Sequence, residues 1–229
     1  MFPATLFDYN GVLANDETVH LAAFQDALAP LGITLSEAAY WEKYLGFDDV
    51  GAFRAILRDS GQAADSVRVA ALVASKRPLY RARAERSLPL FEGAAELIRR
   101  RAQVGPVGIV SGALRDEIEL GLAALGVQDL VATVIAAEDT RASKPDPHGY
   151  ELGVRALSEL IGERAKSALV IEDSLAGIEA ARAAGLTCVA VGHSYPEQEL
   201  LAAGADLVIP NLLALDDAAL TRLYRAKYG

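Results

Sequence analysis

Short apolar runs separated by helical patterns constrain the fold of this chain more than any other feature of its sequence. Amphipathic segments such as 94–103, 118–125, 149–161 and 176–184 lie between most of these runs. Continuous apolar strands that are joined by helices are typical of a parallel sheet covered on both faces. The runs are Ala4–Phe7, Val107–Val110, Val131–Ala136, Ala168–Ile171, Cys188–Val191 and Leu207–Ile209.

The region from residue 15 to residue 82 has a different pattern. Helical periodicity covers 19–31, 36–44, 50–60 and 66–86, and no convincing β run interrupts it. A helical insertion directly after the first strand is the simplest interpretation. We therefore predict an α/β protein of two domains, with residues 1–14 and 83–229 in the sheet domain and residues 15–82 in the inserted one.

Composition limits the classes of partner and the compartment. The net charge of −9 disfavours binding to a phosphate backbone, so nucleic acid is not an expected partner. The single cysteine, Cys188, lies in an apolar run and is expected to be a buried strand residue in a reducing compartment. No signal-peptide pattern and no apolar stretch of about 18 residues is present, so we expect a cytoplasmic location without membrane binding.

Polar residues follow four of the predicted strands, where ligands of open α/β sheets bind. The first strand ends at Asp8 and the second strand ends at Ser111-Gly112. The third strand is followed, after a short loop, by Lys144-Pro145. The fourth strand ends at Glu172-Asp173-Ser174. Each also has an ordinary interpretation. Asp8 could be a turn residue, Ser111 a helix N-cap and Lys144 a solvated lysine. Glu172-Asp173-Ser174 could simply cap the helix that starts near residue 175. Their occurrence together and in order favours a common site.

These residue types suit phosphoryl transfer. Carboxylates from two strands can hold a hard cation such as Mg²⁺, which screens the charge of a phosphate from an anionic nucleophile. Asp8 could then form an aspartyl-phosphate. Ser111, Lys144 and N–H groups of the loops would bind the phosphoryl oxygens.

The same residues resemble the four motifs of the haloacid dehalogenase-like superfamily, over essentially the whole chain. The first motif, Asp-x-Asp-Gly-(Val/Thr)-(Leu/Ile), stands here as Asp8-Tyr9-Asn10-Gly11-Val12-Leu13. The second, third and fourth match Gly108-Ile109-Val110-Ser111-Gly112, Ser143-Lys144-Pro145 and Ile171-Glu172-Asp173-Ser174. The helical insertion resembles the cap of the β-phosphoglucomutase and phosphoglycolate phosphatase branch.

The resemblance implies a Rossmann-like core, a mobile four-helix cap and a Mg²⁺ cofactor, with a small phosphorylated molecule as substrate. Asp8 would be nucleophile and metal ligand, Ser111 and Lys144 would hold the phosphoryl group, and Gly11 and Gly112 would contact it through their loops. The remaining metal ligands would be the Asn10 carbonyl, Asp173 and, directly or in the layer behind, Glu172. His20 and Lys76 stand where this branch often has substrate-facing cap residues.

One departure from the family pattern affects the chemistry. The second aspartate of the first motif, which protonates the leaving oxygen and then activates water, is Asn10 here. Such a group is typically worth about 10²–10⁴-fold in rate. Three alternatives follow. The protein could be a hydrolase that tolerates the loss or replaces the group with His20, Asp16 or a cap acid. The residue could be a deliberate change that slows turnover, or the protein could be a catalytically weak phosphate-binding or regulatory protein.

Other branches of the superfamily fit less well. A 2-haloacid dehalogenase needs no metal, yet Glu172-Asp173 is a metal-type pair. A sugar-phosphate mutase needs the missing acid–base group twice, and the acidic loop 45–50 is unsuited to a second phosphate. A phosphonoacetaldehyde hydrolase, with Lys43 or Lys76 forming a Schiff base, is a minority alternative. We predict a Mg²⁺-dependent phosphatase of unspecified oligomeric state.

Overall fold

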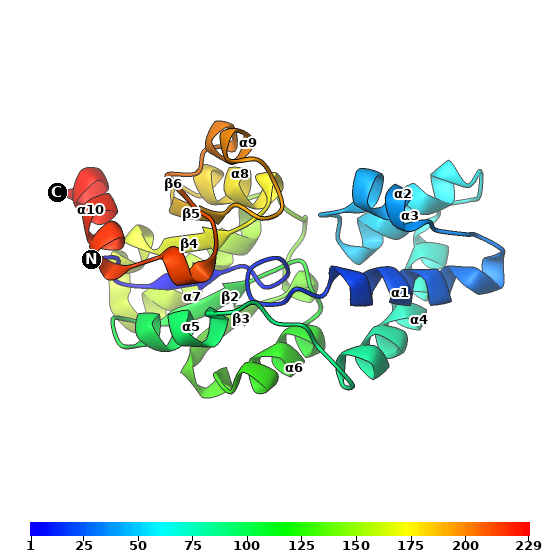
Figure 1. The fold of residues 1–229 in the computed structure, drawn as a ribbon, viewed down its shortest axis with the longest axis horizontal. Coiled ribbons are helices and arrows are strands. Elements are labelled where there is room, and N and C mark those ends of the chain that lie inside the picture. Colours follow the sequence, from blue (N-terminus) through cyan, green and yellow to red (C-terminus); the bar gives the residue numbers. More distant parts are fainter. The chain divides into compact units, whose positions relative to one another are not determined.

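The computed structural model describes residues 1–229, which form two compact units (Figure 1). The sheet unit comprises Met1–Asn15 and Leu90–Gly229, and the helical unit comprises Asp16–Pro89. The sequence predicts that the inserted domain ends at residue 82. The insertion instead extends to Pro89 because its last helix continues to Ala84 and the chain rejoins the sheet unit only at Leu90.

The sheet unit is built on six parallel strands in the order β3-β2-β1-β4-β5-β6. This order confirms the predicted α/β class with a Rossmann-like parallel sheet. Every predicted apolar run overlaps one strand, and only β4 and β5 extend beyond their runs, by one residue each. The strands are β1 (Thr5–Phe7), β2 (Val107–Val110), β3 (Val131–Ile135), β4 (Leu169–Glu172), β5 (Thr187–Val191) and β6 (Leu207–Ile209).

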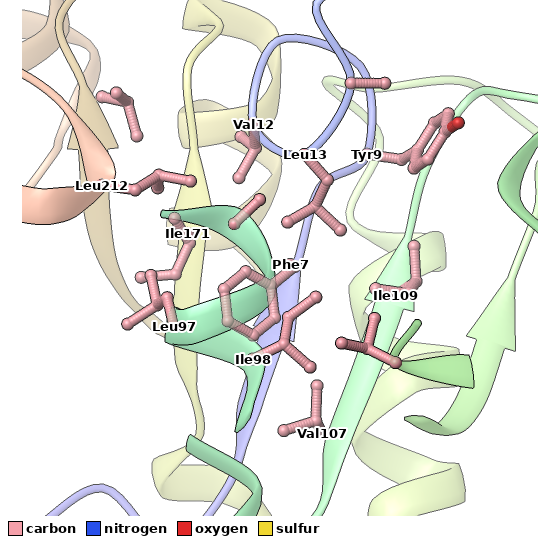
Figure 2. Packing of buried hydrophobic residues seen from close by; sticks show 14 of the residues in the cluster. Phe7, Tyr9, Val12, Leu13, Leu97, Ile98, Val107, Ile109, Ile171 and Leu212 are labelled. Carbon is pink, nitrogen blue, oxygen red and sulfur yellow. The ribbon is translucent and has the colours of Figure 1, made fainter. Parts of the chain in front are cut away.

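Alternate residues of each strand enter two separate apolar cores, because successive side chains of a strand point to opposite faces. Phe7, Ile109 and Ile171 lie in one core, with α5 (Ala94–Ala102), α6 (Arg115–Leu125) and α10 (Asp217–Tyr228) (Figure 2). Leu6 and Val170 lie in the other, with α7 (His148–Ile161), α8 (Leu175–Ala183) and α9 (Glu197–Ala203). Full burial stabilises each such side chain by about 1.5–3 kcal/mol, which explains why the central strands are apolar on both faces.

Short helical turns complete the sheet unit. They connect strands and helices at its surface and carry none of the predicted site residues. They are η3 (Gln128–Leu130), η4 (Ala137–Asp139), η5 (Gly162–Ser167) and η6 (Leu212–Ala214).

The helical unit has its own apolar core, which includes Phe24, Phe53 and Leu57. The side chains of Asp48 and Asp65 accept hydrogen bonds from the first turns of α3 and α4 and so fix where these helices begin. A π-helical turn, η2, ends the segment predicted as one helix over 36–44. The elements are α1 (Glu17–Leu28), η1 (Ala29–Leu31), α2 (Glu37–Ala39), η2 (Tyr40–Tyr44), α3 (Asp49–Asp59) and α4 (Ser66–Ala84).

Two further expectations can be compared with the structure. Cys188 is fully buried in β5, as predicted from its apolar surroundings. None of the helices combines the length and the apolar character that crossing a lipid bilayer requires.

Strand order determines where the chemistry lies. The chain winds from β1 through β2 to β3 on one side, and then returns to place β4 against the other side of β1. Ligands of doubly wound sheets bind outside the carboxyl ends of the strands at such a reversal. We therefore expect ligand-binding residues directly after β1 and β4.

Candidate active site

Asp8 leaves β1 directly beside β4. Its backbone N–H donates to the Ile171 carbonyl at 2.9 Å, which extends the strand pairing by one residue. The chain then turns sharply, since the N–H groups of Leu13 and Ala14 both donate to the Tyr9 carbonyl, at 2.8 and 3.0 Å. Tyr9 is buried in the core and its hydroxyl donates to the Glu117 carbonyl at 3.1 Å. The loop that carries Asp8 is thus anchored on both sides.

Gly11 allows this loop to pass against a second carboxylate. Its φ of 76° lies in the left-handed region that favours glycine. A Cβ atom at this position would lie 2.2 Å from Asp173 Oδ2. Any side chain here would therefore displace the Asp173 carboxylate.

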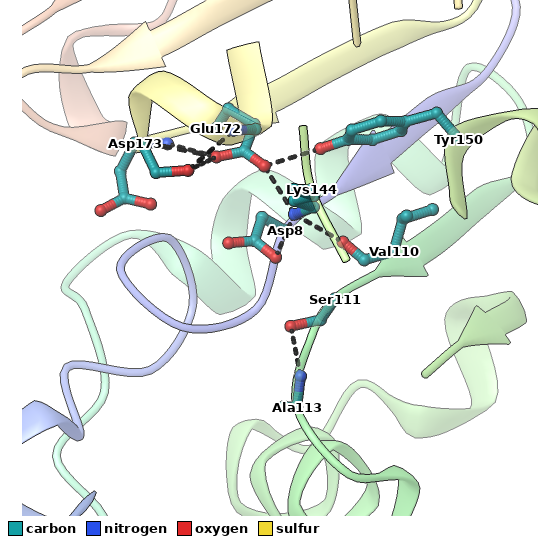
Figure 3. A network of polar contacts seen from close by, with 10 residues as sticks. Asp8, Val110, Ser111, Ala113, Lys144, Tyr150, Glu172 and Asp173 are labelled. Atoms are coloured by element: carbon teal, nitrogen blue, oxygen red, sulfur yellow. Dashed lines mark hydrogen bonds and ion pairs between the residues drawn. The ribbon is translucent and has the colours of Figure 1, made fainter. Parts of the chain in front are cut away.

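Lys144 joins the first and fourth motifs (Figure 3). Its Nζ donates to Asp8 Oδ1 at 2.8 Å, to Glu172 Oε1 at 2.6 Å and to the Val110 carbonyl at 3.1 Å. The Lys144–Pro145 peptide bond is cis. The ammonium group therefore holds Oδ1 of Asp8 in place.

Glu172 is fully buried, and both of its oxygens accept hydrogen bonds. Oε1 accepts from Lys144 and from the Tyr150 hydroxyl, the latter at 2.8 Å. Oε2 accepts from the Asp173 and Ser174 N–H groups at 3.0 and 3.2 Å, and from the Ser174 hydroxyl at 3.1 Å. With these contacts, Glu172 is better suited to orienting Lys144 than to binding a cation directly.

Asp173 is held differently from its neighbour. Its Oδ2 accepts a 2.5 Å hydrogen bond from the Ser194 hydroxyl, and His193 Nε2 lies 4.0 Å from the same oxygen. Ser194 and His193 belong to the loop that follows β5. Asp173 is 7% exposed, as is Asp8, whereas Glu172 is fully buried.

Burial and neighbouring charges shift the pKa values of Asp8, Asp173 and Lys144. Burial raises the pKa of Asp8 to about 6, with Lys144 opposing this shift and Glu172 adding to it. Burial and the charges of Glu172 and Asp8 raise the pKa of Asp173 well above its ordinary value. Burial also disfavours the charged form of Lys144, but Asp8 and Glu172 outweigh this and raise its pKa.

The donor set fits a hard divalent cation. One oxygen from each of Asp8, Glu172 and Asp173 lies within 4.8 Å of the others. Three carboxylates beside one ammonium leave an excess of two negative charges when all are ionised, and a divalent cation would balance it. Carboxylate oxygens are the ligands that Mg²⁺ prefers.

The second motif lies at the exit of β2. Ser111 is 5% exposed, and its hydroxyl accepts from the Ala113 N–H at 3.2 Å. It is not the N-cap of the following helix, because α6 begins at Arg115 with Leu114 as the N-cap. Gly112, next to it, is exposed. By contrast, Ser174 does cap α8, with its hydroxyl accepting from the Gly177 N–H at 3.0 Å.

The two predicted cap residues lie together in the helical unit. Lys76 is fully buried, with its Nζ 2.7 Å from His20 Nδ1 and 2.5 Å from Asp49 Oδ1. His20 Nε2 lies 3.3 Å from Asp16 Oδ2, which also accepts a 2.5 Å hydrogen bond from the Tyr80 hydroxyl. The structure therefore joins His20 and Lys76 in one buried polar network.

Three residues of the site were missed from the sequence. Tyr150 was seen only as an apolar position of a helical pattern, and Ser194 and His193 were not singled out at all. A signal was present for the last two: they follow the fifth apolar run directly, at the edge of the sheet where the other motifs end. Tyr150 gave no comparable signal.

Comparisons with known proteins agree with this geometry. The family model for haloacid dehalogenase-like hydrolases matches residues 5–191. CbbY of Rhodobacter capsulatus is 30% identical over 238 residues, with 96% of this chain and 98% of CbbY covered. Validoxylamine A 7'-phosphate phosphatase of Streptomyces hygroscopicus subsp. limoneus is 36% identical over 122 residues, which cover 53% of this chain and 54% of that protein. The crystal structure of CbbY from Rhodobacter sphaeroides in complex with phosphate has a TM-score of 0.80 at 27% identity, and covers 93% of this chain and 95% of that chain.

Proposed function

We propose that this chain, which belongs to the haloacid dehalogenase-like hydrolase family, hydrolyses a small phosphomonoester with Mg²⁺ through an aspartyl-phosphate on Asp8. The observation that carries the proposal is the position of Asp8. Its carboxylate lies at the exit of the central strand, is held by Lys144 at 2.8 Å and shares a 4.8 Å cluster with Glu172 and Asp173.

In the first step, Asp8 Oδ2 forms a bond to phosphorus while the bond from phosphorus to the leaving oxygen breaks. Lys144 and the N–H groups of the Ser111 and Gly11 loops bind the phosphoryl oxygens, because these donors face the same strand edge. In the second step, the oxygen of a water molecule bonds to phosphorus while the bond from phosphorus to Asp8 Oδ2 breaks. The water proton passes to solvent, and inorganic phosphate and the Asp8 carboxylate are released.

Asp8 and Asp173 would hold the cation, with the Asn10 carbonyl as the ligand from the nucleophile loop and Glu172 directly behind. When bound, Mg²⁺ would screen the negative charge of the phosphate from Asp8. Glu172 keeps Lys144 charged and oriented toward Asp8, since it accepts from the ammonium group at 2.6 Å.

Asn10 determines which substrates react well. An amide does not donate a proton to a leaving oxygen or accept one from water, so this chain lacks the acid–base group that its family has at this position. The half-buried Asn10 follows Tyr9 in the anchored loop and pairs with Ala14. We therefore expect substrates whose leaving group needs no proton, such as aryl phosphates, to be turned over faster than alkyl phosphates.

The substrate class remains broad in this proposal. One relative is named for a phosphatase of a small phosphorylated metabolite, validoxylamine A 7'-phosphate, which supports a small phosphomonoester here. His20 and Lys76 remain predicted substrate contacts. Lys76 is paired with Asp49, and this pairing disfavours it as the free amine that a Schiff base requires. A cytoplasmic location remains part of the proposal.

The test is phosphate release from an aryl phosphate and from a panel of alkyl phosphates, each with Mg²⁺ and with EDTA. We expect metal-dependent turnover that is faster for the aryl ester, and none from Asp8→Asn. Full metal-dependent activity of Asp8→Asn would contradict the mechanism.

Asn10 also favours a second candidate, a protein that binds phosphorylated ligands with little turnover. Both candidates use the same site, so they differ in rate and not in ligand class. Binding of phosphate and Mg²⁺ without release from either ester would favour this second candidate.

A further inference from the structure

The loop after β5 enters the site although none of the four motifs contains it. Ser194 Oγ donates to Asp173 Oδ2 at 2.5 Å. In the sheet, β5 pairs with β4, so its exit lies beside the exit that carries Glu172 and Asp173. This strand therefore contributes a fifth segment to the site.

Ser194 and Gly11 confine the Asp173 carboxylate from two sides. The carboxylate lies against Gly11, where an added Cβ would be 2.2 Å from Oδ2 and 2.6 Å from Oδ1. Ser194 hydrogen-bonds Oδ2. The carboxylate has little freedom to rotate, and the oxygen left for a cation is Oδ1.

His193 links the same loop to the loop that carries the nucleophile. Its ring stacks on Phe91, with centroids 4.5 Å apart and planes inclined by 23°, and its Nε2 lies 4.0 Å from Asp173 Oδ2. The Phe91 N–H in turn donates to the Leu13 carbonyl at 3.0 Å. Ser194 and His193 thus both approach Oδ2 of Asp173, the carboxylate that lies against Gly11.

We propose that Ser194 is a positioning residue of the cation centre, which orients Asp173 so that Oδ1 faces the position shared with Asp8. This inference rests on the proposed Mg²⁺ site. The hydroxyl fixes a ligand that would otherwise rotate, so its contribution is to metal affinity. Partners that orient metal ligands are typically worth about 10–100-fold in affinity.

The test is Mg²⁺ binding to the full chain without substrate, measured by calorimetry. Ser194→Ala is expected to weaken Mg²⁺ binding by about 10–100-fold, while circular dichroism of the EDTA-treated variant shows the secondary structure of the wild type. Ser194→Thr keeps the hydroxyl and should restore the affinity. The matched control is Ser158→Ala, which removes a hydroxyl that bonds only within α7, to the Val154 carbonyl.

Kinetics provide a second readout. The Mg²⁺ concentration for half-maximal activity should rise in Ser194→Ala, while kcat at saturating Mg²⁺ stays near the wild-type value. Unchanged Mg²⁺ affinity in Ser194→Ala, or a lower kcat with unchanged affinity, would overturn the inference. If the wild type binds Mg²⁺ but releases no phosphate, the proposed hydrolysis fails while the binding data still decide the role of Ser194. A wild type that binds no Mg²⁺ overturns both.

Discussion

Replacing Gly177 by alanine should lower the stability of this protein, although helix propensity alone predicts the opposite. Gly177 is the third residue of α8, and its φ is not in the left-handed region. Alanine is normally favoured over glycine inside a helix by about 1 kcal/mol. In this structure, however, an added Cβ would lie 1.9 Å from Glu172 Oε1 and 2.0 Å from Glu172 Cδ.

The carboxylate of Glu172 cannot move away from an added Cβ without losing hydrogen bonds. It accepts five hydrogen bonds, from Lys144, Tyr150, the Asp173 N–H and both donors of Ser174. Overpacking a buried site costs about 1–3 kcal/mol, and losing one hydrogen bond to a charged group about 1.5–3 kcal/mol. After subtraction of the helix gain, Gly177→Ala should destabilise the protein by about 1.5–5 kcal/mol, which lowers the melting temperature by about 3–20 °C.

Thermal unfolding of four proteins tests this reasoning. They are the wild type, Gly177→Ala, Glu172→Ala and the double variant. Once Glu172 is truncated, the new methyl group occupies vacated space, so Gly177→Ala should be neutral or stabilising in that background. A higher melting temperature of Gly177→Ala in the wild-type background, or an equal loss in both backgrounds, would refute the argument.

Three further predictions concern the chemistry and charge of the site. Asn10→Asp should raise kcat/KM for alkyl phosphates by about 10²–10⁴-fold, and for aryl phosphates by much less, because it restores a proton donor at the leaving group; equal gains in a steady-state assay would mean that residue 10 does not face that group. Mg²⁺ at a hundred times its Kd should stabilise the EDTA-treated protein by about 2.7 kcal/mol, measured as a rise in melting temperature, since it offsets the excess negative charge; an unchanged melting temperature would argue against the cation site. Lys144→Met should abolish phosphate release and destabilise the protein by about 3–5 kcal/mol in urea unfolding, because it leaves Glu172 buried without its cation; retained activity would exclude Lys144 from the mechanism.

The sheet could be predicted closely because its strands are buried on both faces. Residues such as Leu6 and Phe7 point to opposite sides of β1, yet each enters an apolar core. Each strand is therefore an uninterrupted apolar run, and its exit is marked by the first polar residue. Asp8, Ser111 and the pair Glu172-Asp173 could be located in this way, before any contact between them was known.

The contacts that each of these residues makes could not be predicted in the same way. Glu172 and Asp173 are adjacent in sequence, but Glu172 accepts hydrogen bonds from Tyr150 of α7, from the N-cap residue of α8 and from Lys144, whereas Asp173 accepts from Ser194 after β5. The difference follows from which direction each side chain leaves β4. The Tyr150 hydroxyl donates to Glu172, and the Tyr150 ring lies 5.3 Å from Lys144 Nζ. The same helical pattern would result from phenylalanine.

The helical unit shows a related limit. His20 and Lys76 could be singled out through the resemblance to the family branch, but their pairing could not be predicted. Lys76 lies between Asp49 and His20 because α1, α3 and α4 bring together positions that are separated by more than a helix length in sequence. Helical periodicity predicts which face of a helix is buried and not which charge it meets there.

The position of β1 at the centre of the sheet has a consequence for how the protein is made. Thr5 pairs with Val107 on one side and with Leu169 on the other. On a ribosome that adds about 5–20 residues per second, the roughly 160 residues between Thr5 and its second partner take about 10–30 s to appear. Both edges of β1 are unpaired until Val107 has been synthesised, and one edge remains unpaired until Leu169 has been synthesised. Asp8 is therefore present in the nascent chain long before Lys144, which hydrogen-bonds it in the folded protein.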